Sequence, residues 1–338
     1  MRIAKRFATV LCAAVLTVAP VFARGTTQGG AGSGAIKIGV AVPTADHGWT
    51  GGIGWWADFA VNKIKAENPN IDFRVVHSNN ATSQVNEVEN LAAWGMNYLV
   101  ILPIESAPLT APIKLLHGQG VKVIVVDRGL TDTTFGYVNL AGDNAGLGRF
   151  SGEWLAKTMK AEGLTNYVAM GGMPVVIDTE RMDAFFSEMN KESSLVNLLG
   201  GNKYEFANWS TQDGLRLMET FLQQYPQIDA VFCQDDDVLT GVLQAIKESG
   251  RTDIKIAIGG AGSKAVMERI KAGDPQVRAT TLYHPSMISD GIQYAVDVAT
   301  GKKSGDFHTA VAPVTVVIPS AIIDISNVDT YYNAGSSY

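Results

Sequence analysis

The stretch that decides the fold of this chain is VVHSNNATSQVNEVENLAAWGMNYLVI, residues 75–101, because it combines the apolar pattern of strands with that of a helix. Both ends are short apolar runs, while the middle places apolar residues three and four positions apart. Such a segment predicts a buried strand, a polar turn, an amphipathic helix and a second buried strand. Residues 204–232, YEFANWSTQDGLRLMETFLQQYPQIDAVF, repeat this layout with different residues. The sequence therefore predicts two copies of one α/β arrangement.

The same alternation extends on both sides of these two segments. Strands are predicted at residues 36–42, 73–77, 98–102 and 121–126, and again at 167–170, 203–207, 230–233 and 255–258. Helices are predicted at residues 55–66, 83–94 and 107–119, and again at 181–192, 213–224 and 238–249. Near-continuous apolar strands are typical of parallel sheets covered by helices on both faces. We therefore predict an α/β fold of two doubly wound parallel-sheet lobes.

The first residues have the pattern of an export signal. Arg2, Lys5 and Arg6 precede an apolar run at residues 7–18, and Val-Phe-Ala at 21–23 matches a small-residue cleavage site. We expect cleavage after residue 23, with residues 24–35 as a flexible linker. The alternative, a lipoprotein, is less favoured because Cys12 lies inside the apolar run.

Composition excludes several classes of function. Loss of residues 1–23 would remove three basic residues and change the net charge from −6 to −9, so nucleic acid is a poor partner. Cys233 alone would remain, which excludes an internal disulfide and a cysteine-ligated zinc site. The five histidines show no paired metal-ligand spacing, so we expect neither a metal nor a cofactor.

Polar and aromatic residues follow the predicted strands. In open parallel sheets, ligands bind at the carboxyl ends of the strands, so two such sheets facing each other would enclose a site. Asp127 and Arg128 follow the predicted strand at 121–126, and Asp235 closely follows the one at 230–233. These residues are therefore candidates for a binding site.

Three segments of the sequence resemble those of a known protein family. They are VIVVDRGLTDTTFGYVNLAGDNAGLGRFSG at 123–152, ERMDAFFSEM at 180–189 and IDAVFCQDDDVLTGVLQAIKESG at 228–250. With them, the chain after residue 23 resembles the periplasmic binding proteins of the ribose and galactose type, which feed ATP-driven importers. The resemblance implies a type I periplasmic binding protein fold and a periplasmic protein that binds a neutral sugar or polyol without catalysis. It implies an ABC permease as a partner and allows a chemoreceptor as another.

The resemblance also implies a division into lobes. One lobe comprises residues 36–142 plus 284–312, and the other comprises 143–283 plus 313–338. Three chain crossings near residues 142–143, 283–285 and 311–314 would form the hinge. Ligand contacts from both lobes would favour closure about this hinge.

The site residues that the resemblance implies are ten. Asp127, Arg128, Arg181 and Asp235 would bind hydroxyl groups, because a hydroxyl can donate to a carboxylate and accept from a guanidinium. Trp49 and Trp209 would stack on the apolar face of the ligand. The ligand-binding set is completed by His47, Ala261, Tyr283 and His284, which stand where the ribose binders commonly have other residues. With Leu102 also replacing a polar contact, these differences argue against ribose itself and leave a hexose or a linear polyol open.

Asp236 and Asp237, which follow Asp235, are expected to cap the next helix instead.

Two other functions are compatible with parts of the sequence. Gly52, Gly54 and Ala57 fit the spacing of a dinucleotide-binding fingerprint, which would suggest an NAD-dependent oxidoreductase. However, nine residues separate Val42 from Gly52, and His77-Ser78-Asn79 replaces the acidic residue expected after the second strand. A sugar-responsive repressor would share the fold, but an export signal occupies the place of its DNA-binding helices.

Overall fold

The computed structural model describes residues 35–45, 48–201 and 203–338. The predicted export signal, most of the predicted linker and His47 lie outside these described residues. In the described part of the chain, no helix has the length and apolar character needed to cross a bilayer.

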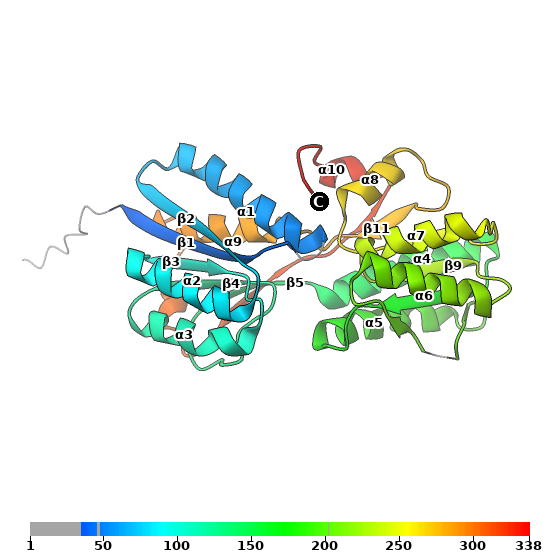
Figure 1. Cartoon of the computed structure of the whole chain (residues 1–338), viewed down its shortest axis with the longest axis horizontal. Coiled ribbons are helices and arrows are strands. Elements are labelled where there is room, and N and C mark those ends of the chain that lie inside the picture. Colours follow the sequence, from blue (N-terminus) through cyan, green and yellow to red (C-terminus); the bar gives the residue numbers. More distant parts are fainter. Residues whose placement is uncertain (1–34, 46–47, 202) are drawn as a thin grey trace, which may run out of the picture. The chain divides into compact units, whose positions relative to one another are not determined.

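Helices and strands alternate along the chain (Figure 1). The described strands are β1 (Ile36–Pro43), β2 (Ile71–Ser78), β3 (Tyr98–Ile101), β4 (Lys122–Val126), β5 (Val138–Gly142), β6 (Asn166–Gly171), β7 (Asn197–Leu198), β8 (Glu205–Phe206), β9 (Ala230–Cys233), β10 (Ile256–Ile258), β11 (Ala279–Thr281), β12 (Val314–Ile318) and β13 (Ile322–Asp324). The described α-helices are α1 (Gly48–Glu67), α2 (Ala81–Trp94), α3 (Ser106–Gly118), α4 (Asn144–Glu162), α5 (Val176–Met189), α6 (Thr211–Gln224), α7 (Asp236–Ser249), α8 (Lys264–Lys271), α9 (Met287–Ala299) and α10 (Val328–Tyr331). Short 3-10 helices lie at Asn190–Glu192 and Asp306–Thr309.

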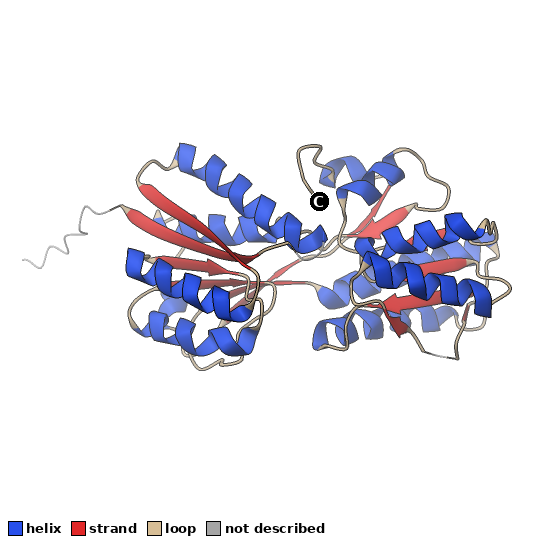
Figure 2. Cartoon of the chain, in the orientation of Figure 1, coloured by secondary structure: helices blue, strands red, loops and turns tan. Residues whose placement is uncertain are grey.

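The described strands form two parallel sheets and one small antiparallel pair (Figure 2). The first sheet has the order β12-β5-β4-β3-β1-β2, and every adjacent pair in it is parallel. The second has the order β10-β9-β6-β7, with β8 also paired to β6. Strands β11 and β13 pair with each other in antiparallel fashion. The predicted α/β fold with two parallel sheets is confirmed.

The first sheet is covered on both faces, as its apolar strands require. Along β4, Ile124 and Val126 belong to one buried cluster, whereas Val123 and Val125 belong to another. Because successive strand residues point to opposite faces, the two clusters mark the two faces of the sheet. Helices α1 and α9 contribute to the first cluster, and α2 and α3 contribute to the second.

The second sheet has the same construction. Alternate residues of β9 fall into different clusters, with Ala230 and Phe232 in one and Val231 and Cys233 in the other. Helices α4 and α5 pack with the first pair, while α6 and α7 pack with the second. Cys233 is fully buried there.

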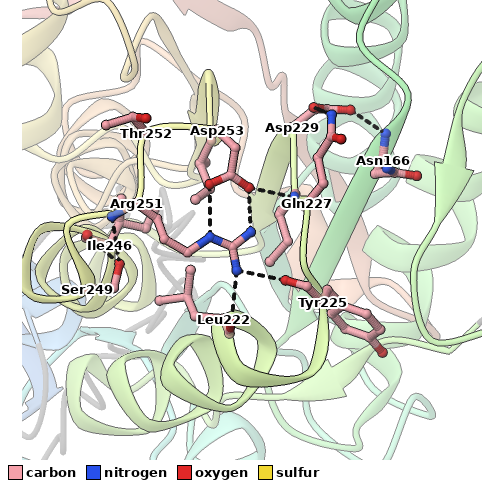
Figure 3. A network of polar contacts seen from close by, with 12 residues as sticks. Asn166, Leu222, Tyr225, Gln227, Asp229, Ile246, Ser249, Arg251, Thr252 and Asp253 are labelled. Carbon is pink, nitrogen blue, oxygen red and sulfur yellow. Dashed lines mark hydrogen bonds and ion pairs between the residues drawn. The ribbon is translucent and has the colours of Figure 1, made fainter.

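The side chain of Arg251 binds carbonyl oxygens at the carboxyl-terminal end of α6 (Figure 3). The Arg251 Nη1 atom donates to the carbonyl oxygens of Leu222 at 2.8 Å and Tyr225 at 2.7 Å, which the end of the helix leaves without helical partners. Arg251 also holds both carboxylate oxygens of Asp253. The hydrogen bond from Arg251 lowers the pKa of Asp253 to about 2.

Three chain segments connect the two parallel sheets. The chain leaves the first sheet after β5 at Gly142, returns between β11 and α9, and leaves again between β12 and β13. Backbone hydrogen bonds tie these crossings together, from Asp143 N to Ile318 O at 3.1 Å and from Leu282 N to Ala321 O at 2.7 Å. The predicted crossings near 142–143 and 283–285 coincide with two of these segments.

The third crossing differs from the prediction. It lies at residues 319–321 instead of 311–314, because β12 pairs with β5 at the edge of the first sheet. The predicted assignment of every residue from 313 onward to the second lobe therefore fails for β12. The apolar run Val314–Ile318 does not reveal which sheet accepts it.

Helix α1 begins earlier than its apolar periodicity indicates, at Gly48 instead of residue 55. Gly52 and Gly54 consequently lie inside the helix, with Gly52 against Pro285 and Gly54 near His77. A dinucleotide fingerprint requires a turn at these glycines. The oxidoreductase alternative therefore loses its only motif.

Candidate functional site

One pocket, of about 170 Å³, collects residues from the ends of strands in both parallel sheets. We call it the strand-end pocket. It is lined by Pro43, Trp49, Thr50, Leu102, Ile104, Asp127, Arg128, Met173, Ile177, Arg181, Asn208, Trp209, Asp235, Ala261 and Tyr283. Eight of the ten predicted site residues are among them, namely Trp49, Asp127, Arg128, Arg181, Trp209, Asp235, Ala261 and Tyr283.

The first sheet contributes a charged pair at the end of β4. Asp127 is buried and Arg128 is half-exposed, and the Arg128 Nε atom lies 3.4 Å from the Asp127 carboxylate. Arg128 also donates from Nη1 to the Ile104 carbonyl oxygen at 3.1 Å. Both residues are thus held by the protein while still facing the pocket.

Tyr283, which follows β11, connects three of the predicted residues. Its hydroxyl donates to Asp127 at 2.6 Å, and its carbonyl oxygen accepts from the Trp49 indole at 2.8 Å. The Arg181 guanidinium lies over the Tyr283 ring, 4.3 Å from the ring centre. Burial raises the pKa of Tyr283, and the charge of Asp127 adds to the rise, so the hydroxyl stays protonated as a donor.

In the second sheet region, Trp209 is oriented by a buried polar chain. The Trp209 indole donates to the Gln234 side-chain oxygen at 3.1 Å, and the Gln234 amide donates to Asp178 at 2.9 Å. Asp178 also accepts from the Tyr204 hydroxyl at 2.7 Å. Gln234 and Asp178 are both buried, and these hydrogen bonds satisfy polar atoms that water cannot reach.

Asp235 has two roles at the end of β9. It caps α7, because its carboxylate accepts from the Asp237 backbone N–H at 2.7 Å, and it also lines the pocket. Burial raises the pKa of Asp235 well above its usual range, and the neighbouring carboxylates of Asp237 and Asp236 raise it further. Arg181 opposes this rise through its positive charge.

The N-cap residue of α7 is thus Asp235, whereas Asp236 and Asp237, which were expected to cap the helix, lie in its first turn. Asp236 instead accepts from the Ser263 backbone at 2.6 Å and from the Thr280 hydroxyl at 2.9 Å. Its side chain joins the start of α8 to β11. Burial raises the pKa of Asp236 to about 7.

The backbone around the pocket is strained. In the described part of the chain, the non-glycine residues with positive φ are Asp127 (66°), Asn208 (51°), Trp209 (52°) and Ala261 (87°). All of them line the strand-end pocket. Such conformations cost about 1–3 kcal/mol each and persist where the surrounding fold enforces them, most often at functional sites.

His284 does not line the strand-end pocket. It lies on the wall of a second cavity of about 650 Å³, where its ring is 5.4 Å from that of Trp56 and 6.4 Å from that of Tyr338. Tyr283 lines both cavities, whereas His284 lines only the second. Burial lowers the pKa of His284 to about 4.

Beyond the predicted residues and Leu102, which the resemblance places at a contact position, six further residues line the pocket: Pro43, Thr50, Ile104, Met173, Ile177 and Asn208. Two signals could have found some of them. Ile104 closely follows a strand end, and Ile177 stands four residues before Arg181, on the same face of α5. Among the described residues, no cluster of His, Cys, Asp or Glu side chains has an arrangement that could hold a metal ion.

A pocket walled by strand ends of two parallel sheets, with three chain crossings between them, is the architecture of a type I periplasmic binding protein. Residues 38–303 match the family model described as a periplasmic binding protein domain. The chain therefore belongs to the periplasmic binding protein family.

Similar proteins agree with this assignment. The ribose import binding protein of Bacillus subtilis (strain 168) is 29% identical over 231 residues, covering 67% of this chain and 70% of that protein. The D-apiose import binding protein of Paraburkholderia graminis is 24% identical over 308 residues, covering 89% of this chain and 92% of that protein. An ABC transporter solute binding protein from Bacillus halodurans C-125, solved with bound myo-inositol, superposes with a TM-score of 0.70 at 20% identity, covering 89% and 98% of the two chains.

Proposed function

We propose that this chain binds one neutral monosaccharide or polyol in the strand-end pocket and serves as the solute-binding protein of an ABC importer, without catalysing a reaction. Ribose, D-apiose and myo-inositol, the compounds named for the similar proteins, are all neutral and rich in hydroxyl groups. These names support the class of ligand.

The balance of charges in the pocket carries the proposal. Asp127 and Asp235 supply two carboxylates, and Arg128 and Arg181 supply two guanidinium groups. A charged ligand would leave one of these four charged groups without a partner of opposite charge. An unpaired charge in a partly buried site is costly in free energy. Hydroxyl groups suit it, because each can donate to a carboxylate and accept from a guanidinium.

Two indole rings complete the pocket. Trp49 lies in the first turn of α1, and Trp209 lies between β8 and α6. Flat aromatic surfaces match the C–H face of a sugar ring or polyol chain and leave its hydroxyls to the charged residues. Because the two rings come from opposite sheets, ligand binding would favour closure about the crossings at 142–143, 282–286 and 319–321.

The lobes in this proposal follow those crossings. The first comprises residues 36–142 and 284–318, and the second comprises residues 143–283 and 319–338. The family assignment supports a periplasmic location for the mature protein, where the permease would recognise its ligand-bound form.

A thermal-shift panel tests the function. Purified protein is mixed with neutral pentoses, hexoses, deoxy sugars and polyols, and the melting temperature Tm is followed. A ligand at about 100 times its Kd should raise Tm by about 5 °C. Incubation with the same ligand should leave it chemically unchanged by mass spectrometry, since no reaction is expected.

A matched pair of variants locates the binding. Asp127→Asn removes a charge from the pocket and tolerates the positive φ at this position, and should abolish the shift. Asp72→Asn, on an exposed position of β2, should retain it. A panel without any stabilising neutral ligand, or a shift that survives in Asp127→Asn, would contradict the proposal.

A further inference from the structure

Four apolar side chains line the strand-end pocket, two from each sheet region, and we call this set the apolar wall. Leu102 and Ile104 line it from the loop that follows β3, and Met173 and Ile177 line it from the loop after β6 and the first turn of α5. None of these four side chains can donate a hydrogen bond, and the Met173 sulfur is only a weak acceptor.

The backbone of the 102–104 loop has already used its main hydrogen-bonding groups. The carbonyl oxygen of Leu102 accepts from the Gln84 amide at 2.9 Å, and the N–H of Ile104 donates to the Gln84 oxygen at 2.7 Å. The Leu102 N–H donates to Ala41 at 3.1 Å, and the Ile104 carbonyl accepts from Arg128 at 3.1 Å. Gln84 is fully buried, and its bond to the Leu102 carbonyl oxygen is buried with it. The loop therefore presents hydrocarbon to a ligand.

The boundary of this wall lies on one helix face. Ile177 and Arg181 are four residues apart in α5 and therefore neighbours on its surface. Arg181 is fixed by a bond from Nε to the Asn144 side-chain oxygen at 2.9 Å and by the Tyr283 ring. Along α5, the pocket lining therefore changes from a charged side chain at Arg181 to an apolar one at Ile177 within about one helical turn.

We propose that the ligand has a hydroxyl-free edge that packs against Leu102, Ile104, Met173 and Ile177, and that it is a 6-deoxyhexose, with a methyl group in place of a hydroxymethyl group. This inference rests on the proposed function. A hydroxyl placed against the wall would lose its bonds to water without replacement. An aliphatic site of this kind discriminates against an added hydroxyl by about 10- to 100-fold.

Paired sugars test the inference, because each pair differs only at one carbon. Isothermal titration calorimetry compares D-fucose with D-galactose, L-rhamnose with L-mannose and D-quinovose with D-glucose, and the polyols xylitol and myo-inositol are titrated alongside. In the pair that matches the charged wall, the deoxy sugar should bind about 10- to 100-fold tighter than its parent hexose.

A variant of the wall should change this ratio in a defined direction. Ile104→Thr keeps the branched shape and adds a hydroxyl, so it should reduce the preference for the deoxy sugar by about 2- to 10-fold. Ile325→Thr makes the same change at an exposed position that does not line the pocket, and should leave the ratio unchanged.

The outcomes separate this inference from the function on which it rests. If a parent hexose binds as tightly as its deoxy partner, or a fully hydroxylated polyol binds tighter than every deoxy sugar, the hydroxyl-free edge is wrong while sugar binding stands. An unchanged ratio in Ile104→Thr would also overturn it. If no sugar or polyol binds, the proposed function fails first.

Discussion

The Tyr283 hydroxyl donates a hydrogen bond of 2.6 Å to the Asp127 carboxylate, although 156 residues separate them in the chain. Both side chains are buried and both line the strand-end pocket. The bond joins the segment after β11 to the end of β4, and it fixes one oxygen of a carboxylate that we propose to bind the ligand.

Tyr283→Phe should lower stability and weaken ligand binding together. Loss of the donor leaves a buried carboxylate oxygen unsatisfied, which costs about 1–3 kcal/mol in the free energy of unfolding. Sugar affinity should fall about 10-fold, since Asp127 loses its orientation. Urea unfolding and calorimetry measure the two effects. Tyr294→Phe, a change at a half-buried tyrosine outside the pocket, should alter neither, and an unchanged affinity in Tyr283→Phe would contradict the role given to this bond.

Gln234→Met should disorient Trp209. The substitution keeps a similar volume but leaves both the Trp209 indole and Asp178 without the amide between them. We expect about a 10-fold loss of sugar affinity and a stability loss of about 1–3 kcal/mol. Gln244→Met, on an exposed position of α7, provides the control. Wild-type affinity in Gln234→Met would show that Trp209 needs no such support.

Arg251→Lys should destabilise the protein by about 1–3 kcal/mol, because an ammonium group cannot hold two carbonyls and both oxygens of Asp253 at once. Urea unfolding at pH 7 measures this loss. Arg216→Lys, at an exposed ion pair of α6, should cost far less.

The same network predicts a dependence on pH. The pKa of Asp253 is lowered to about 2 in the folded protein, so its stabilising contribution is present above its ordinary pKa near 3.8 and is lost as the pH falls from there toward 2. The stability gap between wild type and Arg251→Ala should therefore narrow between pH 4 and pH 2. A gap that stays constant over this range would count against the ion pair.

His284 should contribute a proton linkage of the same sign as that of Asp253, but at higher pH. Its pKa is about 4 in the folded protein and near 6.5 when exposed, so the unfolded chain binds a proton first as the pH falls. This contribution to stability is full above pH 6.5 and declines between pH 6.5 and pH 4. His284→Gln should lose less stability than wild type over this range in urea titrations. His77→Gln, at an exposed site on β2, should follow the wild-type curve.

Ala261→Gly should stabilise the ligand-free protein by up to about 1 kcal/mol, because glycine adopts the φ of 87° without steric strain. Ala257→Gly, in the interior of β10, should destabilise it instead. Differential scanning calorimetry measures both. A loss of stability in Ala261→Gly would mean that packing of the alanine methyl group contributes more to the free energy of unfolding than the backbone strain costs.

Much of the fold could be predicted because buried parallel strands are readable as continuous apolar runs. Strand β9 was predicted at its exact bounds, residues 230–233, and β1 within one residue. The start of α1 was missed, since Gly48 and Gly51 do not signal a helix. Strand β12 carries the residues of a buried strand, yet Val317 is 57% exposed at a sheet edge. Its pairing with β5 depends on tertiary contacts that a local pattern does not contain.

Some residues of the candidate site could likewise be predicted from the sequence, and others could not. Charged and aromatic residues after strands, such as Asp127 and Trp209, are conspicuous because they break an apolar pattern. Ile104 and Ile177 could not be distinguished from core residues by their type. The hydrogen bonds of Gln234 to Asp178, 56 residues away, depend on how β9 and α5 are assembled.

The four left-handed residues of the pocket have a consequence for protein engineering. Transplanting only the side chains of this pocket onto a related scaffold would not reproduce its recognition surface, since Asp127, Asn208, Trp209 and Ala261 owe their directions to main-chain conformations that the host loops would have to supply. A biosensor derived from this protein should therefore exchange whole loops between strand and helix.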